Sequence, residues 1–357
     1  MLLNKNGEDA YFAASNSRHG FYSYYSSCFD DARVGRVFAI KGGPGTGKNR
    51  FMRDVAEAAR RLSRTVEYIY CSSDASSLDG VILTGGGECI ALLDATAPHI
   101  YEPKSPGIRE ELVDLGAFWN RSLLLLKREE INSLNAQKSA AYTRAYRYLA
   151  GAGELRAVRD SLVLPFVRRD AIERCAKRLM GEIPVGQGYS MRHTLMRSVG
   201  MQGEVMLDGL FGLAERTVKI DDCRGIARYL LEAIARIAEA RRQPIRLSHD
   251  PIEPDVIDAV LLCDCGVLFV AGNGREGIPN HKSVGMRRFL DTARMGEVRP
   301  DANAAERGAR MMLDGALKSL ADVRTAHFEL EAIYSAAMDF DAKEKFTKQF
   351  CERLFGE

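Results

Sequence analysis

The chain has 357 residues, of which 46% are apolar, and a formal net charge of +2. This length and apolar content suffice for two ordinary domains, and the near-neutral charge argues against electrostatic binding to nucleic acid. No signal peptide and no apolar stretch of about 18 residues is visible, and the eight cysteines are scattered without zinc spacing. We therefore expect a cytoplasmic protein with free thiols and no membrane partner.

A glycine-rich turn follows the first clear strand. Residues 37–40 form an apolar run that predicts a buried strand, and residues 50–59 predict a helix. The segment between them fits the G-x-x-x-x-G-K pattern of a phosphate-binding loop. Its glycines let backbone N–H groups converge on an anion, and the following helix adds its amides and positive dipole end. The predicted nucleotide-binding residues are Gly42, Gly43, Pro44, Gly45, Thr46, Gly47, Lys48, Asn49 and Arg50.

The last position of this loop departs from the motif. Asn49 stands where a Ser or Thr hydroxyl usually binds Mg²⁺. An amide oxygen can also bind a hard cation, but the longer side chain favours a shifted or water-mediated contact. Asn49 and Asp94 are the predicted metal ligands. Either a weakly active site or one that only binds nucleotide is compatible with this substitution.

Two later strands end in acidic residues. Residues 65–71 predict a strand followed by Ser72-Ser73-Asp74, and residues 89–94 predict an apolar strand that ends in Asp94. Ligands of open α/β sheets lie at the carboxyl ends of the strands. Asp94 is therefore the predicted Mg²⁺-organising acid. Asp74 either orients water or holds Mg²⁺ through water, or it caps a helix or closes a turn. Lys48, Asp94 and Asp74 form the predicted catalytic set.

The alternation of strands and helices predicts an α/β fold with a parallel, doubly wound sheet. The character of the chain changes at Trp119, because residues 119–149 lack Pro and Gly and carry apolar residues at helical spacing. Gly151 and Gly153 are expected to end this helix. A further helical piece over residues 154–180 is expected to break near Pro165, and these helices would form an appendage or lid.

The second half of the chain echoes the first. Residues 40–61 align on residues 220–242, and residues 178–182 match residues 353–357. Several such matches in the same order indicate a duplication. We predict two P-loop-like domains with parallel sheets, residues 1–190 with a helical extension at about 119–182, and residues 191–357 with a helical extension at about 303–357.

The second copy of the loop has lost its phosphate chemistry. Asp221 and Asp222 stand where phosphate oxygens would lie, and like charges repel there. In this alignment Arg228 takes the position of Lys48 and Val270 takes the position of Asp94. We therefore expect only the first copy to bind nucleotide.

Five segments, 38–48, 66–74, 77–82, 93–99 and 144–149, resemble a family of bacterial, mainly Firmicute, tandem P-loop ATPase-like proteins. The resemblance implies two P-loop NTPase domains and places Asp74 and Asp94 beside the γ-phosphate. It also suggests that His99 senses phosphate or carries a proton, against the alternative that His99 closes a turn. The chain departs from the family at Asn49 and in the second loop.

Three functions remain open at this level. The first is an ATP-binding protein with slow Mg²⁺-dependent hydrolysis. The second is a small-molecule or nucleotide kinase in which Arg144 or Arg147 reaches in from a helical lid. The third is a non-catalytic scaffold or switch that responds to nucleotide. ATP is preferred to GTP because no N/TKxD-like guanine reader is present, and either a homo-oligomer or a protein partner is compatible with the sequence.

Overall fold

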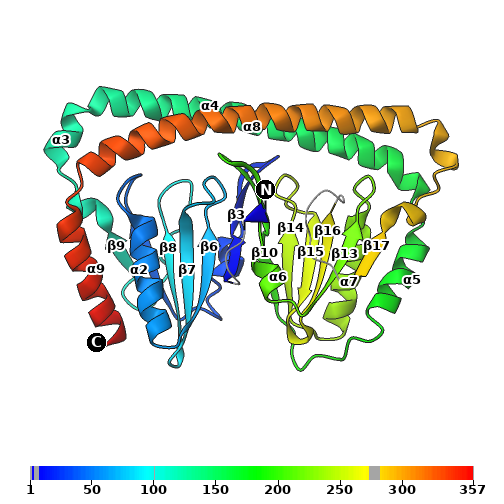
Figure 1. Ribbon diagram of the computed structural model, residues 1–357, viewed down its shortest axis with the longest axis horizontal. Helices are drawn as coiled ribbons and strands as arrows, with labels where there is room; N and C mark the ends of the chain where they lie inside the picture. The colour runs from blue at the N-terminus through cyan, green and yellow to red at the C-terminus, as the bar shows by residue number, and fades with distance from the viewer. Residues whose placement is uncertain (1, 4–7, 100, 273–281, 357) are drawn as a thin grey trace. The chain divides into compact units, whose positions relative to one another are not determined.

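The computed structural model describes residues 2–3, 8–99, 101–272 and 282–356. The chain divides into two compact units, each assembled from two separate stretches. Unit 1 comprises Met1–Cys28 and Tyr146–Leu317, and unit 2 comprises Phe29–Ala145 and Lys318–Glu357. This division differs from sequence domains of 1–190 and 191–357, because two long helices each begin in one unit and end in the other (Figure 1).

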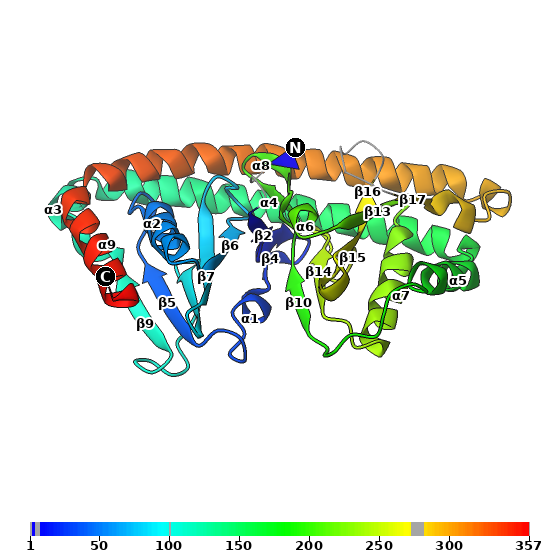
Figure 2. The same cartoon turned by 60° about the horizontal axis from the view of Figure 1, so that its bottom comes forward.

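Unit 2 contains the predicted phosphate loop. Its strands lie in the order β6-β7-β8-β5-β9. The elements are β5 (Arg36–Lys41), α2 (Lys48–Arg61), β6 (Thr65–Tyr70), β7 (Leu78–Gly85), β8 (Glu88–Asp94), β9 (Glu110–Asp114), α3 (Arg121–Leu126) and α9 (Phe340–Phe355). Helix α9 lies beside α2 (Figure 2). Phe350 of α9 packs against Phe38 and Phe51 with ring-centroid distances of 4.9 and 5.1 Å, so the end of the chain completes this core.

The sheet of unit 2 is mixed, and the expectation of a parallel sheet was wrong. Strands β5, β8 and β9 are parallel, whereas β7 runs antiparallel to both β6 and β8. The reason lies in the connections. A parallel pair needs a crossover of a dozen or more residues, but β7 and β8 are joined by the tight turn at Gly86 and Gly87, which have φ of 63° and 80°.

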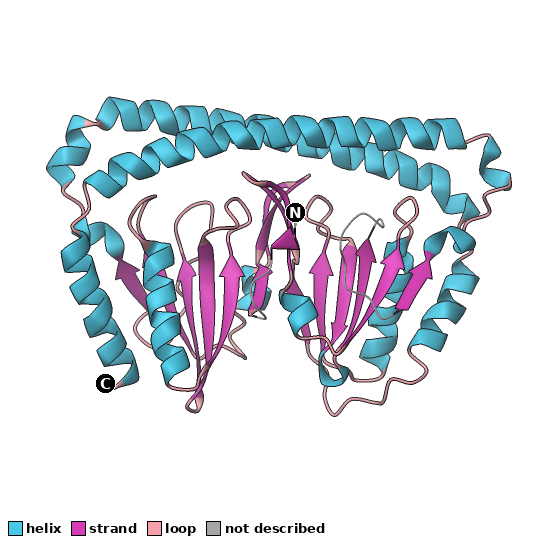
Figure 3. Cartoon of the chain, viewed as in Figure 1, coloured by secondary structure: helices cyan, strands magenta, loops and turns pink. Residues whose placement is uncertain are grey.

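Unit 1 repeats this strand order as β14-β15-β16-β13-β17, with β10 added beside β14. The elements of this mixed sheet are β10 (Met191–Thr194), β13 (Arg216–Asp221), α7 (Ala227–Ala240), β14 (Ile245–His249), β15 (Ile257–Leu262), β16 (Val267–Gly272) and β17 (Lys282–Gly285). Helix α5 (Arg169–Leu179) packs on α7 through buried apolar side chains. Figure 3 shows that strands and adjoining helices make up both units, which are therefore α/β.

Smaller elements complete unit 1. They are β1 (Leu2–Leu3), β2 (Asp9–Phe12), β3 (Ala14–Ser17), β4 (Gly20–Ser23), α1 (Tyr25–Cys28), β11 (Arg197–Gly200), β12 (Gly203–Leu207) and α6 (Gly209–Gly212). Tyr24, which precedes α1, contributes to packing here. The Tyr24 ring stacks on His249 at 4.9 Å between centroids, and its hydroxyl donates to the Pro254 carbonyl.

The two long helices are α4 (Arg128–Val163) and α8 (Arg299–Ala336). Contrary to expectation, α4 continues through Gly151 and Gly153 and ends just before Pro165. Both glycines are sites of close approach. A Cβ at Gly153 would lie 2.7 Å from the Arg18 guanidinium, and one at Gly151 would lie 3.3 Å from the Met312 sulfur. No helix of the described residues is long and apolar enough to cross a bilayer.

Candidate functional site

The phosphate loop joins β5 to α2 in unit 2. Gly42, Gly45 and Gly47 have φ of 147°, 71° and 74°, which L side chains rarely adopt. Helix α2 begins at Lys48 without a side-chain cap. Within the described part of the chain, the N–H groups of Gly45, Thr46, Gly47 and Lys48 take part in none of the hydrogen bonds. The loop thus presents several unused donors at a helix N-terminus, which is the arrangement that binds anions.

Lys48 lies folded over this loop. Its Nζ donates to the carbonyls of Gly42 and Gly43 at 2.7 and 2.9 Å and lies 3.5 Å from Asp94 Oδ2. The parallel register pairs Ile40 with Asp94, so the acid at the end of β8 lies directly beside the loop. Thr96 strengthens this link, because its Oγ1 donates to the Gly42 carbonyl at 2.8 Å. The structure therefore brings together Lys48 and Asp94, two of the predicted site residues.

The carboxylate of Asp94 is poorly hydrated. Its side chain is 13% exposed, and burial raises its pKa while the Lys48 ammonium opposes that rise. Its Oδ1 accepts from the N–H of Thr96 at 2.8 Å, which leaves Oδ2 directed toward Lys48. A cation that binds between Asp94 and a phosphate would relieve the cost of burying this charge.

The other predicted residues lie around this pair. Asn49 Oδ1 accepts from Arg53 Nε at 3.1 Å, so a helix neighbour holds the predicted metal ligand. The exposed Arg50 pairs with Asp54 at 2.8 Å. Asp74 Oδ1 accepts from the N–H and the hydroxyl of Ser76 at 3.1 and 2.6 Å, which is a turn role.

His99 is buried and its Nε2 lies 3.2 Å from Asp79 Oδ2. Burial alone would lower the pKa of His99, but the charge and hydrogen bond of Asp79 outweigh it and raise this pKa. Lys48 and Asp94 also act on the charge of His99. His99 therefore belongs to the surroundings of the loop, paired with a carboxylate that the sequence did not single out.

Sequence reasoning missed three side chains beside the loop. Lys138 of α4 is close enough to Lys48 to be influenced by its charge, and burial lowers the pKa of Lys138. A Cβ at Gly47 would lie 3.5 Å from Nζ of Lys343 in α9. Trp119 lies against Gly43, and its buried indole N–H has no acceptor among the described residues. The cations come from distant parts of the chain, so no local motif could reveal them.

The second copy of the loop lies in unit 1, and the side chain of Asp222 within it occupies the position where an anion would bind. Asp222 accepts from the N–H groups of Gly225 and Ala227, each at 2.8 Å. Asp222 is the counterpart of Gly42, so a carboxylate takes the amides that remain available in unit 2. Arg228, the counterpart of Lys48, is paired with Asp160. The amides of Gly225 and Ala227 are therefore already engaged within the chain itself.

The counterpart of Asp94 needs a correction. The sequence alignment placed Val270 there, but the register pairs Ile220 with Ala271, just as it pairs Ile40 with Asp94. Neither residue can hold a metal.

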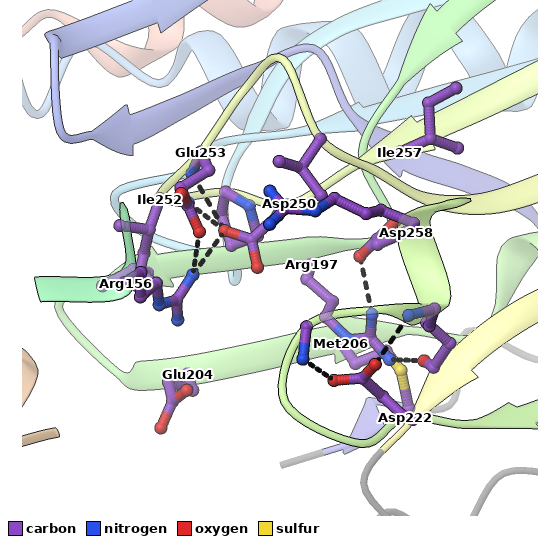
Figure 4. A pocket seen from close by; sticks show the side chains of 18 of the residues that line it. Arg156, Arg197, Glu204, Met206, Asp222, Asp250, Ile252, Glu253, Ile257 and Asp258 are labelled. Atoms are coloured by element: carbon purple, nitrogen blue, oxygen red, sulfur yellow. Dashed lines mark hydrogen bonds and ion pairs between the residues drawn. The ribbon is translucent and has the colours of Figure 1, made fainter. Parts of the chain in front are cut away.

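A cavity of about 490 Å³ remains at this edge of the unit 1 sheet. Its charged side chains are already paired. Figure 4 shows Arg156 directed at Asp250 and Glu253, at 3.0 and 3.2 Å, and Arg197 bonded to Asp258 at 2.6 Å. Because each of these arginines has a carboxylate partner, the cavity lacks the uncompensated positive charge that a triphosphate needs.

No family model, curated protein or solved structure matches this chain.

Proposed function

We propose that this protein binds ATP at the phosphate loop of unit 2. The observation that carries the proposal is the set of unused N–H groups of residues 45–48, at the start of a helix and beneath the Lys48 ammonium. Three glycines in the left-handed region hold the loop in this conformation. A triphosphate would replace the Gly42 and Gly43 carbonyls as the partner of Lys48.

Additional positive charge favours a polyanion at the same place. Lys138 and Lys343 lie near the loop and are partly desolvated, and burial lowers the pKa of both. Bringing phosphate oxygens to such ammonium groups restores the interactions that burial removes. The resemblance to tandem P-loop ATPase-like proteins agrees with this assignment.

Asp94 fits the role of an Mg²⁺ partner. It is buried beside Lys48 with one oxygen available on the side of the loop, and a bound Mg²⁺ would neutralise phosphate charge. Asn49 fits less well, because its oxygen accepts from Arg53. A slow ATPase that uses only unit 2 is the activity this arrangement supports.

A nucleotide-responsive switch without turnover is the second candidate. The observation that favours it is the engagement of Asn49 by Arg53, together with the loop of unit 1 being filled by Asp222. A kinase is less favoured, because Arg144 pairs with Asp322 at 2.9 Å. Nucleotide binding is common to both favoured candidates, so it is the property to test first.

The test measures the unfolding transition of the full chain with ATP or GTP, with and without Mg²⁺. At 100 times its dissociation constant a ligand stabilises by about 2.7 kcal/mol. We expect this stabilisation for ATP and its loss in Lys48→Ala, whereas Lys104→Ala, which changes an exposed lysine of the same unit, retains it. Absence of stabilisation by either nucleotide at millimolar concentration would overturn the proposal.

A further inference from the structure

Three side chains from different strands converge beside the phosphate loop of unit 2. Cys71 follows β6, Asp79 is the second residue of β7, and His99 follows β8. Because β7 is antiparallel to both neighbours, its beginning lies at the same sheet edge as the ends of β6 and β8. The mixed topology, which the sequence did not predict, thus brings these residues together.

The three donor atoms are close enough to share one ion. The Cys71 sulfur, an Asp79 oxygen and a His99 ring nitrogen lie within 4.8 Å of one another, and the nitrogen–oxygen distance is 3.2 Å. Tetrahedral Zn²⁺, with bonds of about 2.0 Å to N and O and about 2.3 Å to S, separates one sulfur and two N or O ligands by about 3.3–3.5 Å. Small side-chain rotations suffice to reach that geometry.

The chemistry of the donors favours a transition metal. Thiolate and imidazole suit Zn²⁺, Co²⁺ or Fe²⁺, whereas Mg²⁺ and Ca²⁺ prefer oxygen ligands. Burial and the charge of Asp79 raise the pKa of the Cys71 thiol, and the backbone N–H groups of Asp74 and Ser73 only partly oppose that rise. A bound divalent cation would supply the positive charge that stabilises the thiolate. Three protein ligands leave a fourth position open for water or another small ligand, as in catalytic zinc sites.

The corresponding positions of unit 1 show what a site without a metal looks like. The strand registers match Cys71 with Asp250 and Asp79 with Asp258. Those carboxylates are compensated by Arg156 and Arg197. Asp79 in unit 2 is only 4% exposed and faces His99, and no arginine of the described residues forms an ion pair with it. A buried carboxylate needs a compensating cation, and a metal ion provides one.

We propose that Cys71, Asp79 and His99 bind one Zn²⁺ or similar divalent transition metal in unit 2. This inference does not depend on nucleotide binding, because the site uses none of the loop residues. The metal lies close to Lys48 and Asp94, whose charges already act on His99. Its open position is available to a water molecule or to an anion held near the loop.

The experiment uses the full chain after treatment with a chelator and reduction of its thiols. Zn²⁺ and Co²⁺ are titrated in turn, and bound metal is measured by equilibrium dialysis with elemental analysis. We expect one ion per chain, and a loss of affinity greater than about tenfold in both Cys71→Ser and His99→Gln. The matched control is Cys89→Ser, another half-buried cysteine of unit 2, which retains wild-type binding.

Co²⁺ supplies a readout that remains valid if a variant fails to fold. Coordination of Co²⁺ by a thiolate gives a ligand-to-metal charge-transfer band, which we expect in the unmodified chain and in Cys89→Ser. Absence of this band, absence of stoichiometric Zn²⁺, or equal metal affinity in folded Cys71→Ser would each overturn the proposal. The His99–Asp79 contact would then be a structural ion pair.

Discussion

The residue that follows β5 in unit 2 and β13 in unit 1 determines whether the backbone amides of the loop are free to bind a ligand. Gly42 contributes no side chain in unit 2, and the amides that follow it remain available. Asp222 in unit 1 satisfies the amides of Gly225 and Ala227 within the chain itself. Because this carboxylate belongs to the chain itself, a phosphate would have to displace it to reach these two amides.

Asn49 permits a prediction about Mg²⁺. Asn49→Ser supplies the hydroxyl that normally binds the metal at this position and releases Arg53. We expect Mg²⁺-dependent ATP affinity to rise several-fold, with a measurable increase in turnover. The measurement compares ATP dissociation constants with and without Mg²⁺, and phosphate release at saturating ATP.

Asn49→Ala is the matched control, because it also releases Arg53 but adds no hydroxyl. The metal argument requires the serine variant to exceed the alanine variant. Equal behaviour of the two would mean that Asn49 acts through Arg53 and that the hydroxyl is irrelevant at this site.

At the scale of elements, the sequence predicted several pieces well and their pairing less well. The strand before the loop, the helix after it and the strand ending in Asp94 all form, since each has a strong local pattern. The prediction of a parallel sheet was wrong, because the connection between β6 and β7 is shorter than a parallel crossover needs. The prediction that Gly151 and Gly153 end the helix was wrong for a different reason, because tertiary packing at these glycines overrides their low helix propensity.

The C-terminal half of α8 is held in unit 2 by a small apolar cluster. Leu330 is 1% exposed and belongs to a cluster with Ile131 and Leu134 of α4. Leu330→Ala is expected to lower the free energy of unfolding by about 2–5 kcal/mol, through lost burial and the cavity that remains. Phe328→Ala, on the same helix but 42% exposed, is expected to cost far less.

Denaturant unfolding monitored by hydrogen exchange measures both variants, because a chain with two units need not unfold in a single step. Loss of protection is expected in α8 and in the first half of α4. Equal destabilisation by the two variants would contradict the assignment of Leu330 to a core position.

At the scale of the whole molecule, the sequence did not predict which segments of the chain form each unit. The matches between the halves indicated a duplication, and the strand order recurs in the two sheets. The sequence could not indicate that α5 completes unit 1 and α9 completes unit 2, because an amphipathic helix packs equally well on either of two similar partners. Lys343 could not be placed beside the loop for the same reason.

Each unit contains a histidine that the fold keeps neutral. Burial and the neighbouring His193, 2.9 Å away, lower the pKa of His249 in unit 1 to about 4. Burial and Lys138 lower the pKa of His327 in unit 2 to about 4. The pKa of an unfolded histidine is about 6.5. The unfolded chain therefore binds more protons between these values, and stability must fall as pH falls.

As the pH falls from 7.5 to 5, His249 and His327 are each expected to lower the free energy of unfolding by about 2 kcal/mol. In the metal-free chain His99 acts in the opposite direction, because its raised pKa stabilises the fold at low pH and this contribution disappears as pH rises. Urea midpoints across this pH range measure the net effect. His249→Gln and His327→Gln should each flatten the profile, whereas His19→Gln, an exposed histidine, should leave it unchanged. The two histidines lie in different units. At pH 5 each variant should therefore increase the hydrogen-exchange protection of the unit that contains its substitution. If neither variant flattens the dependence of the urea midpoint on pH, protonation of these histidines does not control stability.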